Sequence, residues 1–594
     1  MTFKRVLIAN RGEIALRVVR ACRDAGLTSI AVYADPDAGA PYTQLADEAV
    51  ALGGSTAADS YLDIGRLLAA AGQTAADAVH PGYGFLAENA DFAQAVMDTG
   101  LTWIGPPPGV IRALGDKVQA RAIARRAGAP LVPGTTAPVA GAAEARQFAE
   151  QHGLPIAIKA AHGGGGRGLR IVRDLDEVAP LFEAAVREAT AAFGRGECFV
   201  EAYVERGRHV EAQVLADTQG TVVVVGTRDC TLQRRYQKLV EEAPAPFLTD
   251  PQQDLLERSA AAICAAAGYV NAGTVEFLLS PRGELSFLEV NTRLQVEHSA
   301  TEESTDTDLV RAQLLIAAGQ TVAAALGRGA SGPGPVTVAR RHAIEFRINA
   351  EQPAQGFAPS TGTITGLRVP SGPGIRLDSG VEAGSEVGGQ FDSLLAKLIV
   401  TGRDRRQALE RARRALAEFE VTGVQTTLPF FRAVLAEPAF TAEGPDGFAV
   451  HTRWIEQDYR PGADAGSVES LGDGVPVRIG RRWLTADVPG LAQAREGPLA
   501  RAREQARERQ ERAGQAAGDI ISAPMQGTVL RVAVADGDEV AAGQELLVVE
   551  AMKMENPLRA PHPGRVTGLQ AAAGDTVAQG TVLCRVIPAE EDGG

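Results

Sequence analysis

SAPMQGTVLRVAVADGDEVAAGQELLVVE, residues 522–550, is matched 37 positions later by RAPHPGRVTGLQAAAGDTVAQGTVLCRVI, residues 559–587. The two stretches align without a gap, and the matching residues include Gly527 with Gly564, Val529 with Val566, Gly537 with Gly574, and Leu546 with Leu583. Apolar residues alternate within each copy and Gly-Asp turns interrupt them, a pattern typical of short β-strands. The repeat therefore predicts two equivalent sets of strands that form a small flattened barrel with quasi-twofold symmetry.

The junction between the copies contains EAMKMEN (550–556), in which Lys553 stands between two of the chain's five methionines. A hairpin turn at this junction would hold Lys553 in solvent, where another protein could reach it. Taken alone, the heptapeptide also fits a plain strand edge with an exposed lysine. Because it joins two copies of a β repeat, we interpret Lys553 as the carrier of a covalently attached group.

Composition limits what the rest of the chain can be. The 594 residues are too many for one core, so roughly three to five domains are expected. No apolar run approaches the roughly 20 residues that span a bilayer, and no signal peptide is expected. The five scattered cysteines indicate a reducing, cytoplasmic location without a zinc site. The net charge of −14 argues against a sequence-independent nucleic-acid binder.

A glycine-rich segment, KAAHGGGGRG (159–168), is the strongest phosphate-binding signal. Successive glycines let a loop fold over anionic oxygens with its N–H groups inward, and Lys159 and Arg167 add positive charge. No Lys-Ser or Lys-Thr follows the glycines, so this is not a Walker A loop. A bare linker is the alternative, but strand-like runs flank the segment. We therefore expect a strand–loop–strand lid over a nucleotide.

Two carboxylates fall inside strand-like runs, Glu276 in VEFLL and Glu289 in FLEVNTR, and Asn291 follows closely. Carboxylates on neighbouring buried strands repel unless a cation lies between them. Hard oxygen ligands of this kind suit Mg²⁺ or Mn²⁺ bridging nucleotide phosphates. The alternative is an exposed acidic pair on an edge strand.

Many short motifs in residues 1–452 together resemble biotin carboxylase, an ATP-grasp enzyme. They are ANRGEIA, HPGYGFLAEN, IGP, GDK, GGGGRG, EEAPAP, NTRLQVEH, FRINAE and FDSLLAKLI, in that order. The AMKM sequence within the repeat resembles the biotin carboxyl carrier domain of the type without a protective thumb, which makes Lys553 the expected biotinylated residue. Related lipoyl domains usually present Asp-Lys-Ala instead.

The resemblance implies an α/β fold, with pre-ATP-grasp and ATP-grasp α+β lobes, followed by an all-β flattened barrel of the biotinyl/lipoyl type. The expected domains are an N-terminal α/β subdomain (1–116), an ATP-grasp domain with the glycine-rich lid (117–330), a C-terminal biotin carboxylase subdomain (331–452), a linker or docking segment (453–518) and the carrier domain (519–590).

The segment between carboxylase and carrier contains two local patterns. VPVRIGRRWLTADV (475–488) alternates enough for two strands. PLARAREQARERQERAG (498–514) is helical by composition, with Pro498 in the first turn and no apolar stripe. We expect a solvated spacer helix that serves as a swinging arm and subunit-docking element, with a plain linker as the alternative.

The resemblance also assigns a nucleotide and metal site. ATP phosphates are expected at Lys117 and Lys159, under a loop that includes Gly163, Gly164, Gly165, Gly166 and Gly168. The base and ribose are expected near Glu201, Val204, His209 and Gln233, with Tyr236 standing where the better-known bacterial form has His. Two Mg²⁺ or Mn²⁺ ions are expected at Glu276, Glu289 and Asn291.

The remaining assignments concern the carboxylation chemistry. Arg293 would clamp bicarbonate with help from Gln295 and Val296, because a guanidinium binds a planar anion through two hydrogen bonds. Glu297 is the expected base that deprotonates bicarbonate. Arg347 would stabilise the ureido anion of biotin, and Lys238 adds a further catalytic cation.

The implied reaction is ATP-dependent carboxylation of Lys553-linked biotin by bicarbonate through carboxyphosphate. Because no residues are left for a carboxyltransferase, we expect a separate β subunit that carboxylates acetyl-CoA and/or propionyl-CoA, a hetero-oligomer of the two chains, and a biotin protein ligase as partners. One alternative with the same chemistry is the biotin-bearing subunit of a two-subunit pyruvate carboxylase or of a urea-type system. Alternatives of other classes are a non-catalytic biotin carrier or scaffold, and a lipoyl domain fused to a ligase.

Overall fold

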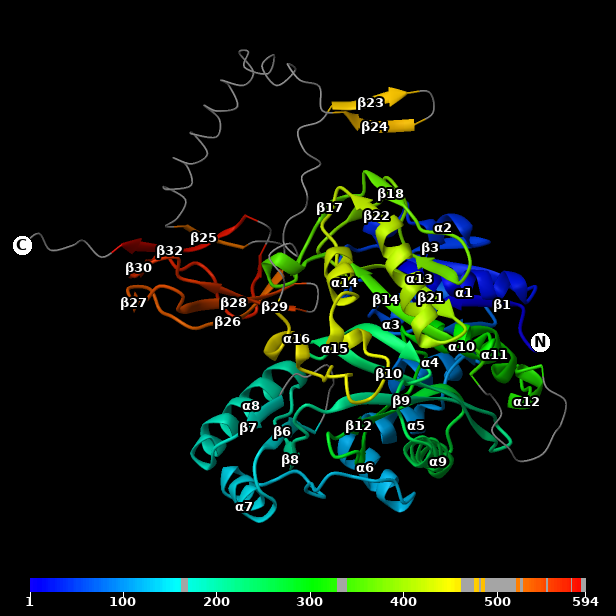
Figure 1. The fold of residues 1–594 in the computed structure, drawn as a ribbon, viewed down its shortest axis with the longest axis horizontal. Helices are drawn as coiled ribbons and strands as arrows, with labels where there is room; N and C mark the ends of the chain where they lie inside the picture. The colour runs from blue at the N-terminus through cyan, green and yellow to red at the C-terminus, as the bar shows by residue number, and fades with distance from the viewer. Residues whose placement is uncertain are drawn as a thin grey trace, which may run out of the picture. The chain divides into compact units, whose positions relative to one another are not determined.

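The computed structural model describes residues 1–161, 169–327, 339–460, 475–479, 482–486, 520–523, 527–551, 554–577 and 580–588. The chain divides into two compact units (Figure 1). The first comprises Met1–Asn349, Thr363–Glu386 and Leu394–Arg460, and the second comprises Ala350–Gly362, Val387–Ser393 and the chain from Pro461. Among the described residues, no helix has both the length and the apolar character needed to cross a membrane.

The first unit begins with a five-stranded parallel sheet in the order β3-β2-β1-β4-β5. Its strands are β1 (Arg5–Ile8), β2 (Thr28–Tyr33), β3 (Glu48–Ala51), β4 (Ala78–His80) and β5 (Thr102–Trp103), accompanied by α1 (Gly12–Asp24), α3 (Ile64–Gln73), α4 (Ala90–Asp98) and α5 (Pro108–Gly115). The strand order reverses beside β1, and in such sheets ligands bind where the order reverses. There the loops after β1 and β4 meet, because Asn10 Nδ2 donates to the carbonyl oxygens of Pro81 and Tyr83 at 2.7 Å.

An eight-stranded sheet forms the centre of the first unit, in the order β13-β12-β9-β10-β11-β14-β21-β19. The strands are β9 (Arg208–Ala216), β10 (Val222–Arg234), β11 (Gln237–Ala243), β12 (Asn271–Leu279), β13 (Leu285–Asn291), β14 (His342–Asn349), β19 (Ile375–Ser379) and β21 (Leu394–Gly402). Every neighbouring pair is antiparallel. The helices that accompany it include α6 (Lys117–Arg126), α9 (Asp250–Ala267), α10 (His298–Thr305), α11 (Leu309–Ala317), α13 (Arg405–Glu418), α14 (Leu428–Val434) and α16 (Trp454–Gln457).

A three-stranded sheet flanks the glycine-rich segment. It contains β6 (Ile156–Ala160), β7 (Leu169–Val172) and β8 (Cys198–Ala202), with α8 (Val178–Phe193) packed on β6 and β7 and α7 (Ala142–His152) packed on α8 (Figure 1). β6 and β7 are antiparallel, and Lys159 lies opposite Leu169. The predicted strand–loop–strand arrangement is therefore confirmed for its two strands. The loop itself, 162–168, lies outside the described residues.

The C-terminal repeat folds as two four-stranded antiparallel sheets, β25-β32-β30-β27 and β29-β28-β26-β31. The strands of the first copy are β25 (Ile520–Ser522), β26 (Gly527–Val532), β27 (Glu539–Val540) and β28 (Glu545–Ala551). Those of the second are β29 (Met554–Arg559), β30 (Gly564–Thr567), β31 (Thr576–Val577) and β32 (Val582–Pro588). Exchanging each strand for its repeat partner turns one sheet order into the other, so the predicted quasi-twofold barrel is confirmed.

Matching residues of the repeat occupy matching places. Val529 and Val566 are both fully buried, and Leu546 and Leu583 have exposed fractions of 0% and 1%. Gly537 and Gly574 have φ angles of +96° and +97°, a backbone region that favours glycine. The backbone conformation of each Gly-Asp turn therefore favours glycine at this position in both copies.

The two strands predicted within the linker are also present. β23 (Val475–Ile479) pairs antiparallel with β24 (Arg482–Ala486). The predicted spacer helix, 498–514, lies outside the described residues.

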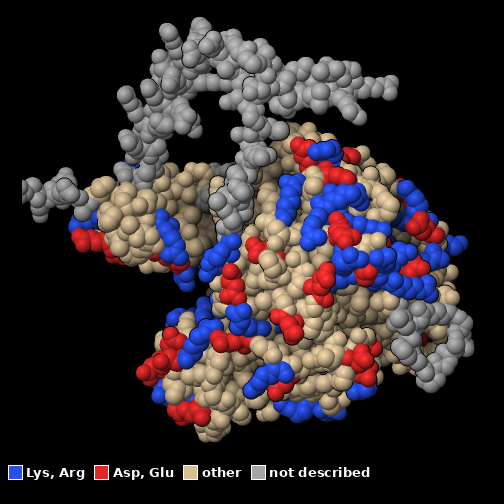
Figure 2. Space-filling model, in the orientation of Figure 1, with Lys and Arg blue, Asp and Glu red and all other residues tan. Residues whose placement is uncertain are grey.

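Figure 2 shows basic and acidic side chains interleaved on the face of the first unit that it presents. Part of this pattern is local pairing along α13, where Arg406 lies 3.8 Å from Glu410 and Arg414 lies 3.0 Å from Glu418. Such exposed pairs contribute little to stability. Other charged side chains, including Glu211, Arg228 and Glu297, are buried inside the unit.

Candidate active site

Lys238 is the centre of a buried cluster of charges on the central sheet. Its Nζ lies 2.8 Å from Glu211 Oε2, 2.8 Å from Glu276 Oε1 and 2.6 Å from Glu297 Oε1. Burial alone would lower the pKa of Lys238, but the three carboxylates outweigh burial and raise this pKa well above its ordinary value. Lys238 is therefore a permanent cation at neutral pH.

Strand geometry brings these side chains together. Glu211 on β9 lies between Glu276 on β12 and Arg228 on β10 in the sheet register. On β11, Gln233 of β10 pairs with Lys238 and Leu232 pairs with Val240, so that Leu239 forms a β-bulge. A bulge shifts the alternation of side chains by one residue. As a result, β11 supplies both Lys238 and Glu241 to the cluster.

Glu297, the predicted base, is 2% exposed and lies just before α10. Besides Lys238, it accepts a hydrogen bond from Arg347 Nη2 at 2.9 Å. Burial raises the pKa of Glu297, but Lys238, Arg347 and Arg228 together outweigh burial, and the pKa falls to about 2. Glu297 is therefore ionised at neutral pH.

Arg347, the predicted stabiliser of the developing anion, extends from β14. Its Nε donates to Glu241 Oε1 at 2.6 Å, and its Nη2 donates to Glu297. Glu241 on β11 has no exposed surface and was not among the residues predicted from the sequence. The structure thus places Arg347 between two carboxylates.

Arg228 is a further residue that the sequence reasoning missed. It is completely buried, and its Nε donates to Glu211 Oε1 at 2.5 Å. Its other N–H groups donate to Gln213, Thr301, Thr274 and Gln295 at 2.8–3.1 Å. Alternating polar residues on a strand that is otherwise buried, as in RHVEAQ, are the signal that could have indicated this polar face of the sheet.

Gln295, predicted to bind bicarbonate, is held at both ends of its amide. Its Oε1 accepts from Arg228, and its Nε2 donates to Glu276 Oε1 at 3.0 Å. The carbonyl oxygen of Val296 accepts from Lys397 Nζ at 2.6 Å. Arg228 and Lys397 thereby orient the segment that ends at Glu297.

Arg293 lies on the side of the cluster that faces the N-terminal sheet. Its Nε donates to Glu88 Oε2 at 2.8 Å, and its Nη2 donates to Asn291 Oδ1 at 3.3 Å. The backbone N–H of Thr292 donates to Glu88 Oε1 at 2.9 Å. Glu88 belongs to the HPGYGFLAEN motif, and this contact joins two motifs about 200 residues apart in the sequence.

The predicted metal ligands lie side by side. Glu276 and Glu289 are cross-strand partners on β12 and β13, and Asn291 Nδ2 donates to Glu276 Oε1 at 2.8 Å. Lys117 Nζ lies 3.9 Å from Glu289 Oε2. The acidic pair is therefore not an isolated edge pair, since Lys238 also contacts Glu276. Adjacent carboxylate and amide oxygens fit a divalent cation.

His209 lies closer to the acidic cluster than its predicted place beside the ribose suggests. Its Nε2 is 3.2 Å from Glu276 Oε2 and 3.6 Å from Glu211 Oε2. Burial lowers the pKa of His209, but Glu276 and Glu211 together outweigh burial and raise the pKa to about 9. His209 thus adds positive charge to the same cluster.

Two residues predicted to contact the nucleotide, Lys159 and Glu201, meet on the three-stranded sheet. Lys159 on β6 contacts Glu201 on β8, and Arg121 Nη1 lies 2.5 Å from Glu201 Oε2. Burial would raise the pKa of Glu201, but Lys159 and Arg121 outweigh it and hold the pKa below its ordinary value. Arg121, on α6, was not predicted from the sequence.

Two other residues predicted to contact the nucleotide, Gln233 and Val204, have different neighbours. Gln233 Nε2 donates to the carbonyl oxygen of Cys230 at 3.2 Å. Val204 helps line a cavity of about 490 Å³ with Tyr203 and residues of the β12–β13 turn. Glycines 163–166 and 168, like Lys553, lie outside the described residues.

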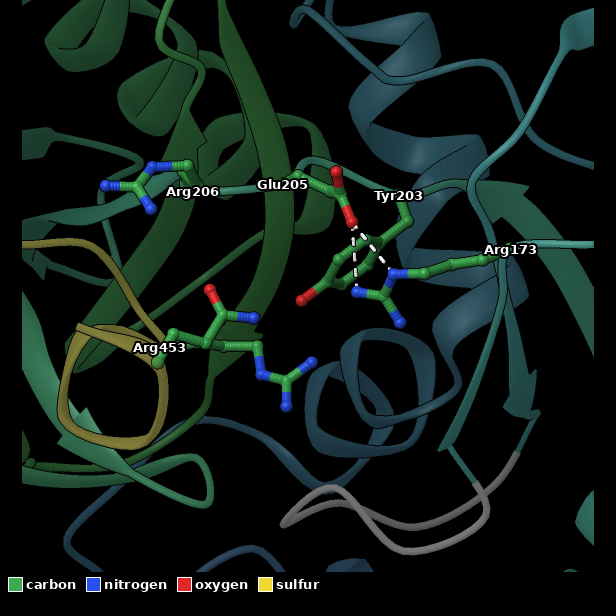
Figure 3. Close-up of a pocket in the computed structure, with 6 residues that line it drawn as sticks. Arg173, Tyr203, Glu205, Arg206 and Arg453 are labelled. Atoms are coloured by element: carbon green, nitrogen blue, oxygen red, sulfur yellow. Dashed lines mark hydrogen bonds and ion pairs between the residues drawn. The ribbon is translucent and has the colours of Figure 1, made fainter.

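A second cavity, of about 330 Å³, lies where the lid meets the body of the unit (Figure 3). Its lining residues are Arg173, Tyr203, Glu205, Arg206, Arg453 and Gln457. In Figure 3 the side chains of Arg173 and Glu205 face each other, and the two groups form an ion pair at 2.9 Å. Burial and the neighbouring Tyr203, to which Tyr236 is hydrogen-bonded, raise the pKa of Tyr236 to about 12. Tyr236 therefore stands beside this cavity and not in the acidic cluster.

Comparison with protein families accounts for most of the chain. Residues 2–111 match the N-terminal domain of biotin carboxylase, and 345–457 match its C-terminal domain. Residues 116–325 match the ATP-binding domain of the carbamoyl-phosphate synthase L chain, and 519–586 match the biotin-requiring enzyme domain. These matches cover the site and the β repeat, and they identify ATP and biotin as the groups that the two parts bind.

Individual proteins are similar over long stretches. The biotin-dependent acyl-coenzyme A carboxylase alpha3 subunit of Mycobacterium leprae is 55% identical over 98% of each chain, and the propionyl-CoA carboxylase alpha chain of Ruegeria pomeroyi is 35% identical over 98% of this chain and 99% of that one. The biotin carboxylase domain of a Hydrogenobacter thermophilus 2-oxoglutarate carboxylase, solved with MgADP and bicarbonate, has a TM-score of 0.72 and 42% identity over 78% of this chain and all of that chain. The chain therefore belongs to the family of biotin-dependent acyl-CoA carboxylase alpha subunits, in which a biotin carboxylase of the ATP-grasp type and a biotin-bearing domain share one polypeptide.

Proposed function

We propose that this chain uses ATP and bicarbonate to carboxylate biotin attached to Lys553, and that a separate carboxyltransferase β subunit then carboxylates an acyl-CoA, acetyl-CoA and/or propionyl-CoA. The observation that carries the proposal is the buried contact of Glu297 with both Lys238 and Arg347, beside Gln295 and Val296. A base and two cations in one water-poor site suit a reaction that deprotonates bicarbonate and develops negative charge.

Bicarbonate is proposed to bind between Arg293, Gln295 and Val296. The planar guanidinium of Arg293 can donate two parallel hydrogen bonds to a planar anion. The amide of Gln295 is fixed by Arg228 and Glu276, so this side of the site is organised before the anion arrives. Glu297 then accepts the proton of bicarbonate, and Lys238 neutralises charge on the attacking oxygen.

Arg347 is proposed to stabilise the ureido anion of biotin. Its guanidinium is held in place by Glu241, while its contact with Glu297 weakens when that carboxylate accepts a proton. Proton transfer to Glu297 would therefore free positive charge on Arg347 at the moment when the biotin anion forms. Donors that are fixed before the reaction stabilise a developing charge without reorganisation.

The nucleotide is proposed to bind under the lid. Lys117 and Lys159 supply charge for its phosphates, the segment with Gly163, Gly164, Gly165, Gly166 and Gly168 closes over them, and Glu201, Val204, His209, Gln233 and Tyr236 surround the nucleoside. Glu276, Glu289 and Asn291 hold one or two Mg²⁺ or Mn²⁺ ions. Two observations support this arrangement, the juxtaposed carboxylates of β12 and β13 and the MgADP bound to the Hydrogenobacter relative.

Lys553 is proposed to bear the biotin. Ala551 pairs with Met554 at the end of the β28–β29 ladder, so Lys553 is one of the two residues between these paired positions. This place fits access by a biotin protein ligase. A tether on the same chain raises the effective concentration of biotin at the carboxylase site.

The test is a reconstitution with candidate β subunits. Protein purified from its native host should bind avidin and carry one biotinyl group in its intact mass, and Lys553→Arg should lose both. The complex should fix bicarbonate onto acetyl-CoA or propionyl-CoA in an ATP-dependent reaction that avidin inhibits. An unmodified Lys553, or full activity of Lys553→Arg, would contradict the proposal.

A second candidate is the biotin-bearing subunit of a two-subunit pyruvate carboxylase. One subunit of the pyruvate carboxylase of Methanothermobacter thermautotrophicus is 44% identical over 78% of this chain and 91% of its own length. Pyruvate belongs in the same assay for this reason, and carboxylation of pyruvate but of no acyl-CoA would favour this candidate.

A further inference from the structure

Four charged side chains share one buried layer of the central sheet behind the active site. Glu345 and Arg347 are two positions apart on β14, so they lie on the same face of the strand. The register places Glu345 opposite Glu241 on β11, and Arg347 opposite Lys397 on β21. Glu241, Glu345 and Lys397 have no exposed surface. Two carboxyl groups therefore meet side by side in a dry interior.

The cations of this layer are already engaged by other groups. Arg347 donates to Glu241 and Glu297. Lys397 Nζ donates to Val296 O at 2.6 Å and to Ser299 Oγ at 2.7 Å, and it lies 3.4 Å from Glu13 Oε1. Within the described part of the chain, neither oxygen of Glu345 has a hydrogen-bond partner.

A lone ionised carboxylate in such a place is strongly disfavoured. Removing a charge from water without a hydrogen-bonded partner costs more than neutralising the group. Two carboxyls at one place also cannot both ionise easily, because their charges repel. Glu241 has a guanidinium partner, while Glu345 has none, so the proton belongs on Glu345.

We infer that Glu345 is protonated in the working enzyme, and that its neutral carboxyl leaves Glu241 ionised to hold Arg347. Glu345 is then a positioning residue that acts on Arg347 through Glu241. The inference about catalysis rests on the proposed role of Arg347, while the protonation state does not.

The directions of the pKa shifts agree with this geometry. Burial raises the pKa of Glu345 to about 8 against the attraction of Lys397, and burial raises the pKa of Glu241 to about 7 against the attraction of Arg347. Because the two groups interact, these values describe the pair. The other groups that act on the pair are Glu297 before α10, Lys238 on β11, and, through Lys397, Glu13 on α1 and Asp378 on β19.

Loss of the Glu345 proton at alkaline pH has a predictable effect on Arg347. When Glu345 is ionised, a second carboxylate charge besides that of Glu241 attracts the Arg347 guanidinium. The guanidinium then interacts more strongly with the protein and stabilises a developing anion on biotin less. We therefore expect kcat to fall above about pH 8, where the pair loses its proton.

The same titration must affect stability. The folded-state pKa of Glu345 lies above its ordinary value of 4.5, so its contribution is fully present below pH 4.5 and is lost as the pH rises through about 8. Glu345→Gln keeps a neutral side chain of the same shape and removes the titration. The Tm of this variant minus the Tm of the wild type should therefore increase as the pH rises from 6 to 9.

Glu242, on β11 beside Glu241, provides a matched control. It is buried next to Glu241, but Arg405 donates to it at 2.7 and 2.8 Å and His342 lies 2.8 Å away. Because Glu242 is ionised and paired, Glu242→Gln should lower the Tm at pH 6 and at pH 9 alike.

The experiment uses the full-length biotinylated chain. Infrared spectra of the wild type at pH 7 should contain a protonated-carboxyl C=O band that disappears toward pH 9 and is missing in Glu345→Gln. For bicarbonate- and biotin-dependent ATP cleavage, Glu345→Gln should keep kcat at pH 7 within about twofold and should lose less activity than the wild type above pH 8.

Two results would overturn the inference. One is the lack of a protonated-carboxyl band in the wild type at pH 7, a measurement that does not depend on the folding of any variant. The other is a pH profile of kcat for Glu345→Gln that superimposes on that of the wild type. If the wild-type chain has no carboxylase activity, the proposed function is contradicted instead. The protonated-carboxyl infrared band would still show whether Glu345 is protonated.

Discussion

The carboxylase unit and the biotin-bearing β repeat both bury apolar side chains, but only the carboxylase unit also buries many charged ones among the described residues. Among the described residues of the repeat, every buried side chain is uncharged, as with Val529, Leu546, Val566 and Leu583. In the central sheet of the carboxylase, Glu211, Arg228, Glu241, Glu345 and Lys397 are all fully buried. One region is held together by apolar packing, while the other maintains a network of charges in its interior.

The difference shows where stability and chemistry reside. Apolar packing is non-directional and tolerates similar shapes. A buried charge requires every partner to be present, and a well-packed apolar substitute is often as stable. Under the proposed function, the cost of burying so many charges in the carboxylase is explained by catalysis, whereas the repeat has only to present Lys553.

The largest expected effect comes from removing a buried cation. Arg228→Met leaves Glu211 with less compensation and leaves Gln295 without a donor, so the free energy of unfolding of the carboxylase should fall by about 3–5 kcal/mol. Urea unfolding of the full chain would measure the change. A loss below about 1 kcal/mol would show that this network adapts as easily as an apolar core.

Arg347→Ala should separate catalysis from nucleotide binding. The loss of a group that stabilises the developing anion should lower kcat by about 10²–10³, while the KM for ATP should change little. Steady-state ATP cleavage with bicarbonate and free biotin measures both constants, with Arg347→Lys as the charge-conserving control. Equal losses in kcat and in ATP binding would remove the proposed role.

The ion pair of Glu242 and Arg405 predicts a dependence of stability on acid. Burial raises the pKa of Glu242, but Arg405 and His342 together outweigh burial and lower the pKa to about 2. Because the folded-state pKa lies below the ordinary value of 4.5, this stability is present above pH 4.5 and is lost as the pH falls through 2. The contribution is about 3 kcal/mol. Glu242→Gln should flatten the fall in unfolding free energy between pH 5 and pH 3, and an unchanged slope would contradict the assignment.

The repeat offers a symmetric test of apolar packing. Leu546→Ala and Leu583→Ala each remove a buried leucine from equivalent positions, and each should cost about 2–5 kcal/mol. Hydrogen exchange of peptides from 527–588 in the full chain would report the local loss. Costs that differ by more than about 2 kcal/mol would show that the two copies are no longer equivalent in packing.

The smallest effect is expected on the surface. Arg406 and Glu410 form an exposed pair on α13, with side chains 60% and 56% exposed. Arg406→Ala should change the unfolding free energy by less than about 0.5 kcal/mol. This substitution serves as the baseline for Arg228→Met in the same urea experiment, and a comparable loss in both variants would erase the distinction between buried and exposed charge.

Several features of the site could be predicted from the sequence because they depend on local patterns. Glu276, Glu289 and Asn291 were recognised as carboxylates and an amide in neighbouring strand-like runs, and β12 and β13 do pair in that register. Lys238, Gln295, Glu297 and Arg347 were named through the resemblance of their motifs, and the structure brings these four residues into one cluster. Their individual roles are still predictions.

Other parts of the site could not be predicted from local patterns. Arg121, Glu88, Arg228 and Glu241 were missed, although each contacts a predicted residue. Glu345 was also missed, and it lies opposite Glu241. Each owes its place to a strand register, a bulge or a contact between distant motifs. Glu88 and Glu241 lie within motifs of the sequence, but no local pattern around these residues says which side chain each of them contacts.

The sequence by itself determined the β repeat. Alternating apolar residues and glycine turns direct the backbone over only a few residues, and the same pattern occurs in both copies. It also determined the lid hairpin, whose strands are neighbours along the chain. Only the tertiary structure decided which charges share the dry face of the central sheet. Their energies depend on partners from β9, β10, β11, β12, β14 and β21, and therefore on contacts that form only when these distant strands pair.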